Sequence, residues 1–222
     1  MPLGVTVDGA GKRTVRSKYL GSLLGCALGD AIGELAFSYG KKSLLVSMVE
    51  KTQVLRYTDD TAMAMGLAES IAEKRTVDPQ HLGDVFLRNF LQEPWRGYAS
   101  GPPAIFTMVR SSGMSYTEAA KTLFQGAGSL GNGAAMRVAP VGLFFHNSKD
   151  LYEWAGLSAE VTHAHPVGID GAAVQAWAVA RAVGIDSDSP FSAQEFIEAL
   201  ISVSRTKEMQ SKLVMVRDLI RG

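Results

Sequence analysis

The chain has 222 residues, of which 46% are hydrophobic and 20% charged, a composition typical of a globular protein and not of a disordered one. Lysine plus arginine and aspartate plus glutamate both number 22, so the net charge is zero, and we expect neither nucleic acid nor a membrane surface as a partner. Cys26 is the only cysteine, which excludes an internal disulfide and fits a reducing, cytoplasmic location.

The N-terminal part of the chain divides into a tail and a first helix. Residues 1–17 are polar and glycine-rich and lack a secretory signal, so we expect a flexible tail followed by one helical domain over 18–222. Residues 18–37 are predicted to form a helix that is too short before Asp30 to span a bilayer. Its glycines recur every fourth residue and predict the close approach of another helix, at Gly21, Gly25, Gly29 and Gly33.

Hard oxygen donors cluster just before the next helical run, Thr61 to Lys74. Thr58, Asp59 and Asp60 are consecutive, and a hydroxyl beside two carboxylates suits Mg²⁺. The same residue types also cap helices and complement the helix dipole. The motif alone therefore leaves open a metal site and a simple helix cap. Asp30 and Glu34, one helical turn apart, could face a common site or lie on a solvated turn.

The remainder of the chain also reads as helices. No run of alternating apolar and polar residues predicts a strand, and no repeat is visible, so the predicted fold class is all-α. Asp78-Pro79 and the Ser115 to Glu118 capping box mark two helix starts. Further helices are expected near 43–49, 79–92, 103–110, 115–124, 150–162, 168–183, 192–203 and 206–220, with an apolar run over 134–145.

A glycine-rich loop occupies residues 126–133. Gly126, Gly128 and Gly131 match the spacing of a dinucleotide fingerprint, but that fingerprint requires a strand before it, and a helix is predicted there. The loop can still turn several backbone N–H groups towards a phosphate. A phosphate cradle and a plain connecting loop both remain open.

Two histidines, His163 and His165, stand before the long alanine-rich helix. With four histidines and one distant cysteine in the chain, a zinc site is hard to complete. We interpret them as hydrogen-bonding groups.

Taken in order, the motifs resemble the ADP-ribosylglycohydrolase family, also called the dinitrogenase-reductase-activating or ADP-ribosylhydrolase family. The glycine loop with Arg137 and the Arg-Gly-Tyr triplet look closest to the branch that removes ADP-ribose from serine. The matching stretches are Gly25–Gly33, Tyr57–Met63, Arg96–Tyr98, Gly128–Arg137 and Thr162–Pro166.

The resemblance implies an orthogonal all-α bundle that holds two Mg²⁺ ions and hydrolyses the C1″ glycosidic bond of ADP-ribose on a modified protein or peptide. It implies Thr58, Asp59 and Asp60 as metal ligands, with Asp59, Asp60 and, as a substitute, Glu34 in catalysis. The substrate-binding residues implied are Gly128, Ser129, Leu130, Gly131, Asn132, Gly133, His163 and Tyr98.

Two departures from the family pattern shape the expectations. Phe37 stands where the family has a glutamate, and the second acidic motif that supplies the remaining metal ligands is absent before Gly222. We therefore expect an incomplete metal site of weak affinity, and exposed apolar surface that favours self-association. A module that binds ADP-ribose without cleaving it is the alternative, and a structural helical protein with Thr58-Asp59-Asp60 only as a cap is the second.

Overall fold

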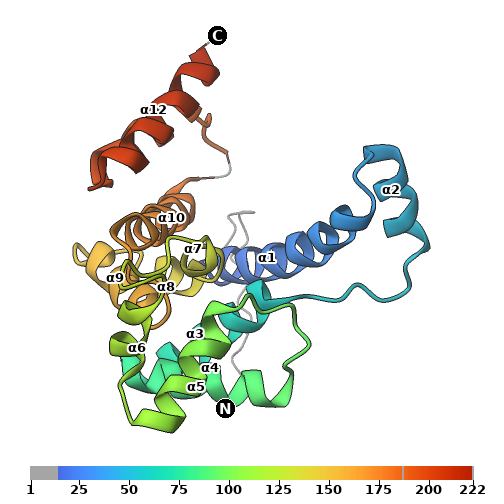
Figure 1. Ribbon diagram of the computed structural model, residues 1–222. Helices are drawn as coiled ribbons and strands as arrows, with labels where there is room; N and C mark the ends of the chain where they lie inside the picture. The colour runs from blue at the N-terminus through green and yellow to red at the C-terminus, as the bar shows by residue number, and fades with distance from the viewer. Residues whose placement is uncertain (1–14, 187, 222) are drawn as a thin grey trace, which may run out of the picture.

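The computed structural model describes residues 15–186 and 188–221, and these contain helices and no strand, which confirms the all-α prediction (Figure 1). The helices are α1 (Val15–Ser38), α2 (Lys42–Lys51), α3 (Asp59–Lys74), α4 (Pro79–Gln92), α5 (Gly101–Ser112), α6 (Tyr116–Thr122), α7 (Gly133–Met136), α8 (Ala139–Phe144), α9 (Leu151–Glu160), α10 (Pro166–Gly184), α11 (Ala193–Val203) and α12 (Lys207–Arg221).

The predicted tail ends earlier than expected. Most of it lies outside the described residues, but residues 15–17 are already helical. The reason is tertiary: the Lys18 ammonium donates to the carbonyls of Val183 and Ile185, at 2.7 and 2.6 Å, and holds the first turns of α1 on the end of α10.

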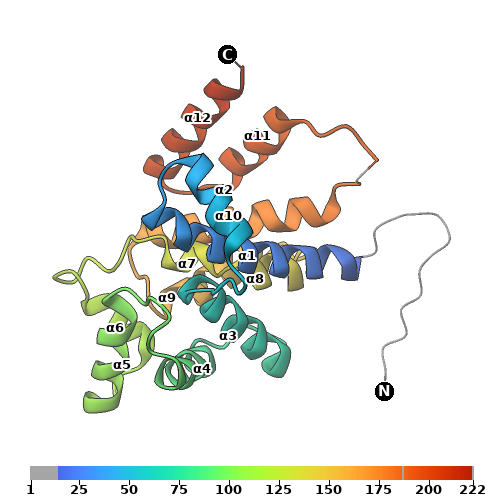
Figure 2. The ribbon, with the colours of Figure 1, turned by 90° about the vertical axis from the view of Figure 1, so that its right-hand side faces the viewer.

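The core forms around α10, which packs against α7, α8 and α9, while α3 packs against α4 and α8 (Figure 1). The small side chains of Ala172, Ala173 and Ala176 are fully buried and let neighbouring helices approach closely. Met63, Leu67 and Ile71 form the buried face of α3, as their helical spacing predicts. In Figure 2, α11 and α12 lie side by side beyond α10.

Local signals determine several helix starts. The Asp78 carboxylate accepts the His81 N–H at 3.0 Å, and both halves of the Ser115 and Glu118 capping box are formed. The apolar run after the glycine loop is not one helix. It is split into α7 and α8 at Arg137 and Val138, and α8 carries a proline in its first turn.

The glycine stripe of α1 is not packed as predicted. A side-chain carbon added at Gly21, Gly25, Gly29 or Gly33 would meet nothing within 4 Å among the described residues. The helix is instead attached by polar side chains, and Leu20, Leu24 and Leu28 are at least half exposed. In Figure 1, α1 and α2 extend away from the other helices. Self-association through this surface stays a prediction.

By length and composition alone, α1 could cross a membrane, because its 24 residues have a mean hydropathy of 1.4 over the most apolar window. In this fold the same helix carries polar attachments to α8 and α10. The Tyr19 hydroxyl donates to the Leu143 carbonyl, in addition to the Lys18 contacts.

Candidate functional site

The start of α3 is capped by a residue from another helix. The Asp30 carboxylate, on α1, accepts the Thr58 N–H at 2.8 Å and the Thr58 hydroxyl at 2.5 Å. It also accepts the Thr61 N–H at 3.1 Å and the Thr61 hydroxyl at 2.6 Å. Thr58 occupies the N-cap position but its side chain makes no cap hydrogen bond. Thr58, Asp59 and Asp60 thus occupy the N-cap and first turn of α3, as the cap hypothesis expects, while Asp30 supplies the cap hydrogen bonds.

Asp59 and Asp60 lie in the first turn of α3. Neither carboxylate forms an ion pair with the described part of the chain. Burial raises the pKa of Asp59 to about 6, with further contributions from the negative charges of Asp60 and Asp30. Burial and the charge of Asp30 also raise the pKa of Asp60. Such mutually repelling carboxylates are typical of a functional site.

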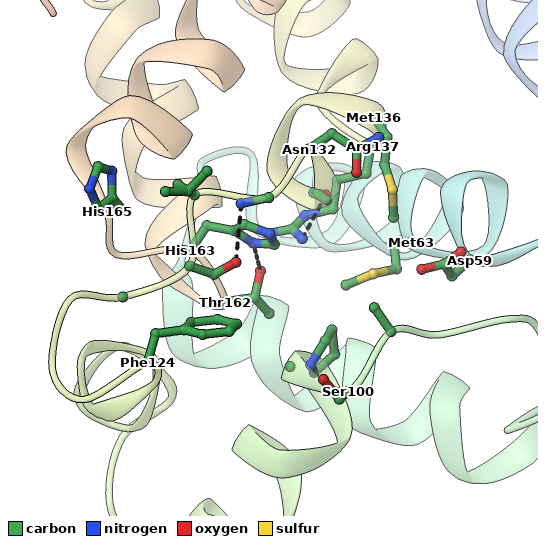
Figure 3. A pocket seen from close by; sticks show the side chains of 18 of the residues that line it. Asp59, Met63, Ser100, Phe124, Asn132, Met136, Arg137, Thr162, His163 and His165 are labelled. Carbon is green, nitrogen blue, oxygen red and sulfur yellow. Dashed lines mark hydrogen bonds between the residues drawn. The ribbon is translucent and has the colours of Figure 1, made fainter. Parts of the chain in front are cut away.

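Asp59 lies at one end of a cavity of about 590 Å³. Figure 3 shows Asp59 and Met63 at one end of this cavity, Phe124 and His165 at the other, and His163 with Arg137 on the inner wall. The glycine loop forms one side and residues 99–102 the opposite side. A volume of this size is typical of a site for a small organic ligand.

The glycine loop is held against the segment that begins α10. The Ser129 carbonyl accepts the His165 N–H at 3.3 Å. Gly128 has φ +74°, and a side-chain carbon there would lie 2.7 Å from the His165 nitrogen. A side-chain carbon at Gly133 would lie 2.7 Å from Cε1 of His163. Gly128 and Gly133 are thus required by close packing, which favours a shaped wall over a plain connecting loop.

His163 is a buried neutral imidazole on the cavity wall. Its Nδ1 and the Thr162 hydroxyl form a hydrogen bond of 2.7 Å, while Nε2 lies on the side of the glycine loop. Burial, and secondarily the positive charge of Arg137, lower its pKa to about 3. His163 can therefore donate or accept a hydrogen bond without carrying charge at neutral pH. His165 caps α10 by accepting the Val167 N–H, so both histidines form hydrogen bonds as interpreted.

Arg137 is the largest fully buried side chain in the described part of the protein. Its guanidinium donates to the carbonyls of Gly133 and Ser158, at 3.0 and 2.9 Å, and lies 4.9 Å from the centre of the Phe86 ring. Its Nε has no hydrogen-bond partner among the described residues. Burial lowers the pKa of Arg137 to about 9, against the opposing effect of Asp59. This buried positive charge lines the cavity beside Gly133.

The structure brings most of the predicted site residues to this one cavity. The residues of the prediction that line it are Asp59, Gly128, Ser129, Leu130, Gly131, Asn132, Gly133 and His163. Asp60 follows Asp59 but is absent from the wall, and Thr58 and Glu34 line a neighbouring cavity. The Tyr98 ring packs edge-on against Phe90, 5.1 Å between centres, and faces a third hollow.

Glu34 lines the same cavity as Thr58, and its catalytic role stays a prediction. It is exposed and outside the cavity that Asp59 lines, since it lies on α1 beyond the turn that carries Asp30. Phe37, at the position of the family's glutamate, is 90% exposed. Neither side chain contributes to the main cavity.

Several wall residues were missed by sequence reasoning, notably Phe124, Met136 and Thr162. Phe124 is 63% exposed, and it and Gln125 adopt left-handed backbone conformations with φ of +53° and +60°. Such conformations are uncommon away from glycine and often mark functional loops. No signal in the sequence distinguishes Phe124 from an ordinary helix-end residue.

The donors at α3 fit a hard cation by type. Two carboxylates with raised pKa values and a threonine oxygen lie at consecutive positions, and Asp30 holds their backbone in place. Within residues 15–186 and 188–221, no group of three or more histidine, cysteine or acidic side chains forms a metal cluster. The fit is thus that of a partial site, short of the six oxygens that Mg²⁺ prefers.

Comparison with known proteins agrees with this geometry. Residues 11–222 match the ADP-ribosylglycohydrolase family. The chain is 33% identical to ADP-ribosylhydrolase ARH3 from Bos taurus over 93% of its length, and 31% identical to the ADP-ribosyl-[dinitrogen reductase] glycohydrolase of Rhodospirillum rubrum over 69%. It covers 60% and 54% of those two proteins.

A solved structure titled as an ADP-ribosylglycohydrolase-related protein complex has the same fold, with a TM-score of 0.58 at 24% identity. The superposition covers 85% of this chain and 61% of the other. The chain thus spans about three fifths of the length of the relatives that it matches. The family match over nearly the whole sequence, together with the helical fold, shows that the chain belongs to the ADP-ribosylglycohydrolase family.

Proposed function

We propose that this chain binds ADP-ribose in the cavity between the glycine loop and residues 99–102, and that it belongs to a hydrolase acting at the C1″ carbon of protein-linked ADP-ribose. The observation that carries this proposal is the position of Asp59. An unneutralised carboxylate lies at one end of a 590 Å³ cavity whose opposite wall is a closely packed glycine loop. The ligand's ribose end would face Asp59 and its diphosphate would face the loop.

Each part of the wall suits one part of such a ligand. The N–H groups of Gly128 and Gly131 already donate to the Leu123 carbonyl and the Ser129 hydroxyl, so other N–H groups of the loop would cradle the diphosphate, and the buried charge of Arg137 on the same cavity adds a positive field. The exposed ring of Phe124 offers a flat face for a base. Neutral His163 can hydrogen-bond the ligand without electrostatic cost.

At the reacting end, water adds to C1″ and the acceptor oxygen leaves with a proton. The carboxylate of Asp59 would stabilise the positive charge that develops on the sugar ring. Thr58, Asp59 and Asp60 would hold Mg²⁺, which supplies orientation of the ribose hydroxyls and polarisation at that end. We infer this metal dependence from the donor types and from the family resemblance.

The first test is calorimetric titration of the chain with ADP-ribose, with and without Mg²⁺. We expect binding that Mg²⁺ strengthens, and an Asp59→Asn variant that binds at least about tenfold more weakly with Mg²⁺ present, a loss of about 1.4 kcal/mol. Asp150→Asn is the control, because Asp150 is an aspartate at the start of another helix, α9, but is exposed and lines none of the described cavities. Equal affinity of both variants would contradict the assignment of Asp59.

One observation favours a second candidate, an ADP-ribose-binding module without hydrolysis. Glu34 lies outside the main cavity and Phe37 is solvent-exposed, so no described residue takes the place of the family's glutamate there. Release of ADP-ribose from a modified peptide distinguishes the two: binding without release supports the module, and release supports the hydrolase. Thermal stability that ignores both ADP-ribose and Mg²⁺ would contradict both candidates and support a structural protein.

A further inference from the structure

A second cavity of about 570 Å³ lies directly beside the main one. Thr58 lines the second cavity while Asp59 lines the first, and Gly97 lines the second while Ala99 lines the first. The two hollows therefore meet at the same two backbone segments. A ligand whose reacting carbon lies at Asp59 in the main cavity is a short distance from the second.

Arg96 links the segments that separate the two cavities. The Arg96 guanidinium lies 3.8 Å from the centre of the Tyr57 ring and donates to the Tyr57 carbonyl at 3.1 Å. Its other nitrogens bind the Glu93 carboxylate at 2.8 and 3.0 Å. Gly97, with φ +82°, brings its backbone close enough that a side-chain carbon there would lie 3.7 Å from Cβ of Thr58. This fastening keeps the second cavity open beside the turn of α3.

The lining of the second cavity differs from that of a nucleotide site. Trp95 lines this cavity, and its side chain is 70% exposed. Glu34 and Arg56 are exposed charges of opposite sign, and within the described part of the chain neither forms an ion pair or a hydrogen bond. The negative charge of Glu34 in this lining disfavours a second phosphate. An exposed indole flanked by both charges matches a polypeptide, which offers apolar groups and side chains of either sign.

We propose that this cavity, the acceptor cavity, binds the polypeptide segment that carries the ADP-ribose. The inference rests on the proposed function, because it requires ADP-ribose in the main cavity with its C1″ end at Asp59. Trp95 packs on the peptide, and Glu34 and Arg56 pair with its charged or polar groups. Free ADP-ribose would occupy the main cavity alone and make no contact with Trp95.

The test compares three ligands on the same chain: ADP-ribose, a short peptide carrying ADP-ribose on a serine, and the unmodified peptide. For the wild type we expect the modified peptide to bind about tenfold more tightly than ADP-ribose, the size of effect that a central tryptophan contact supplies. Trp95→Ala should bring that ratio close to one and leave the affinity for ADP-ribose unchanged. Trp95→Phe should restore part of the ratio, since it retains a flat ring.

Phe191→Ala is the matched control, since Phe191 is a 60% exposed aromatic residue that lines none of the described cavities. It should change neither affinity. Tight ADP-ribose binding with no gain from the peptide, or an unchanged ratio in Trp95→Ala, would overturn the acceptor cavity alone. Failure of the wild type to bind ADP-ribose would overturn the proposed function and this inference with it. Equal binding of modified and unmodified peptide would show a peptide surface unrelated to the nucleotide, which also contradicts the inference.

Discussion

Two helix starts in this protein are capped in the same unusual way, by an aspartate from a distant helix. Asp30 on α1 caps α3, and Asp170 on α10 caps α12 by accepting the N–H and the hydroxyl of Thr206 at 2.7 and 2.6 Å. At α3 the Asp30 carboxylate replaces the cap that the Thr58 side chain does not make, whereas at α12 the Thr206 hydroxyl also accepts the Met209 N–H, at 3.3 Å. The device is shared, but its consequences differ.

At α12 the carboxylate is fully satisfied. Asp170 is completely buried and also accepts the Tyr152 hydroxyl at 3.0 Å and the Arg205 N–H at 3.1 Å. Burial acts to raise its pKa, but the hydrogen bonds from Thr206, Arg205 and Tyr152 outweigh burial and lower it. At α3, the first turn that Asp30 caps carries Asp59 and Asp60, whose pKa values are raised. The α12 joint, which is the set of hydrogen bonds to Asp170, stabilises the fold. The α3 joint, which is the set of hydrogen bonds to Asp30, holds repelling charges in place for a ligand.

Among the substitutions that test this comparison, we expect the largest change in stability from one at the α12 joint. Asp170→Asn should lower the free energy of unfolding by about 3 kcal/mol, because it turns an amide N–H₂ towards donors in a buried site. Urea denaturation measures the change, with Asp150→Asn as the exposed control. A loss below about 1 kcal/mol would mean that the cap hydrogen bonds contribute little net stability.

The next effect tests the wall of the main cavity. Gly133→Ala places a methyl group 2.7 Å from Cε1 of His163, and we expect a destabilisation of about 2 kcal/mol together with loss of ADP-ribose binding. Gly25→Ala is the matched substitution, since nothing lies within 4 Å there, and helix propensity should make it stabilising by about 0.7 kcal/mol. Equal stability changes in the two variants would contradict the close packing at Gly133.

A smaller effect depends on pH. His163 has a folded pKa of about 3, below its ordinary value near 6.5, so the unfolded chain binds one more proton between these limits. Stability therefore falls as the pH drops through that window. His163→Gln removes this term, and from pH 6.5 to pH 5 it should lose about 1–2 kcal/mol less than the wild type. Parallel stability curves for the two proteins would show that His163 is not buried as a neutral ring.

The smallest expected effect is a gain in stability, opposite in sign to the loss expected for Asp170→Asn. Asp59→Asn removes a charge that burial and Asp60 disfavour, so the melting temperature should rise by about 2 °C while Mg²⁺-dependent binding is lost. Differential scanning calorimetry in the absence of Mg²⁺ measures the shift. A fall in melting temperature would contradict the view that Asp59 is held at a cost to stability, and would make the α3 joint structural like the α12 joint.

Much of the fold could be predicted because its signals are local. The apolar face of α3, the Asp78 cap and the Ser115 box depend on residues within one or two turns of each other. The glycine loop could be recognised for the same reason. The split between α7 and α8 also has a local signal, since Pro140 has no N–H to continue the helix, but the burial of Arg137 against the Gly133 and Ser158 carbonyls depends on the core and could not be predicted.

The sequence by itself determined the helices, the acidic turn at Thr58 to Asp60, and the glycine loop, because each depends on interactions between residues that are close in the chain. Only the tertiary structure decided that Asp30 caps α3, that Glu34 lies outside the main cavity, and that the α1 glycines contact no described neighbour. These outcomes depend on contacts between residues tens of positions apart, such as Asp30 with Thr58 and Gly133 with His163. Periodicity and capping rules act within a helix and its ends, so they carry no information about which distant side chains meet.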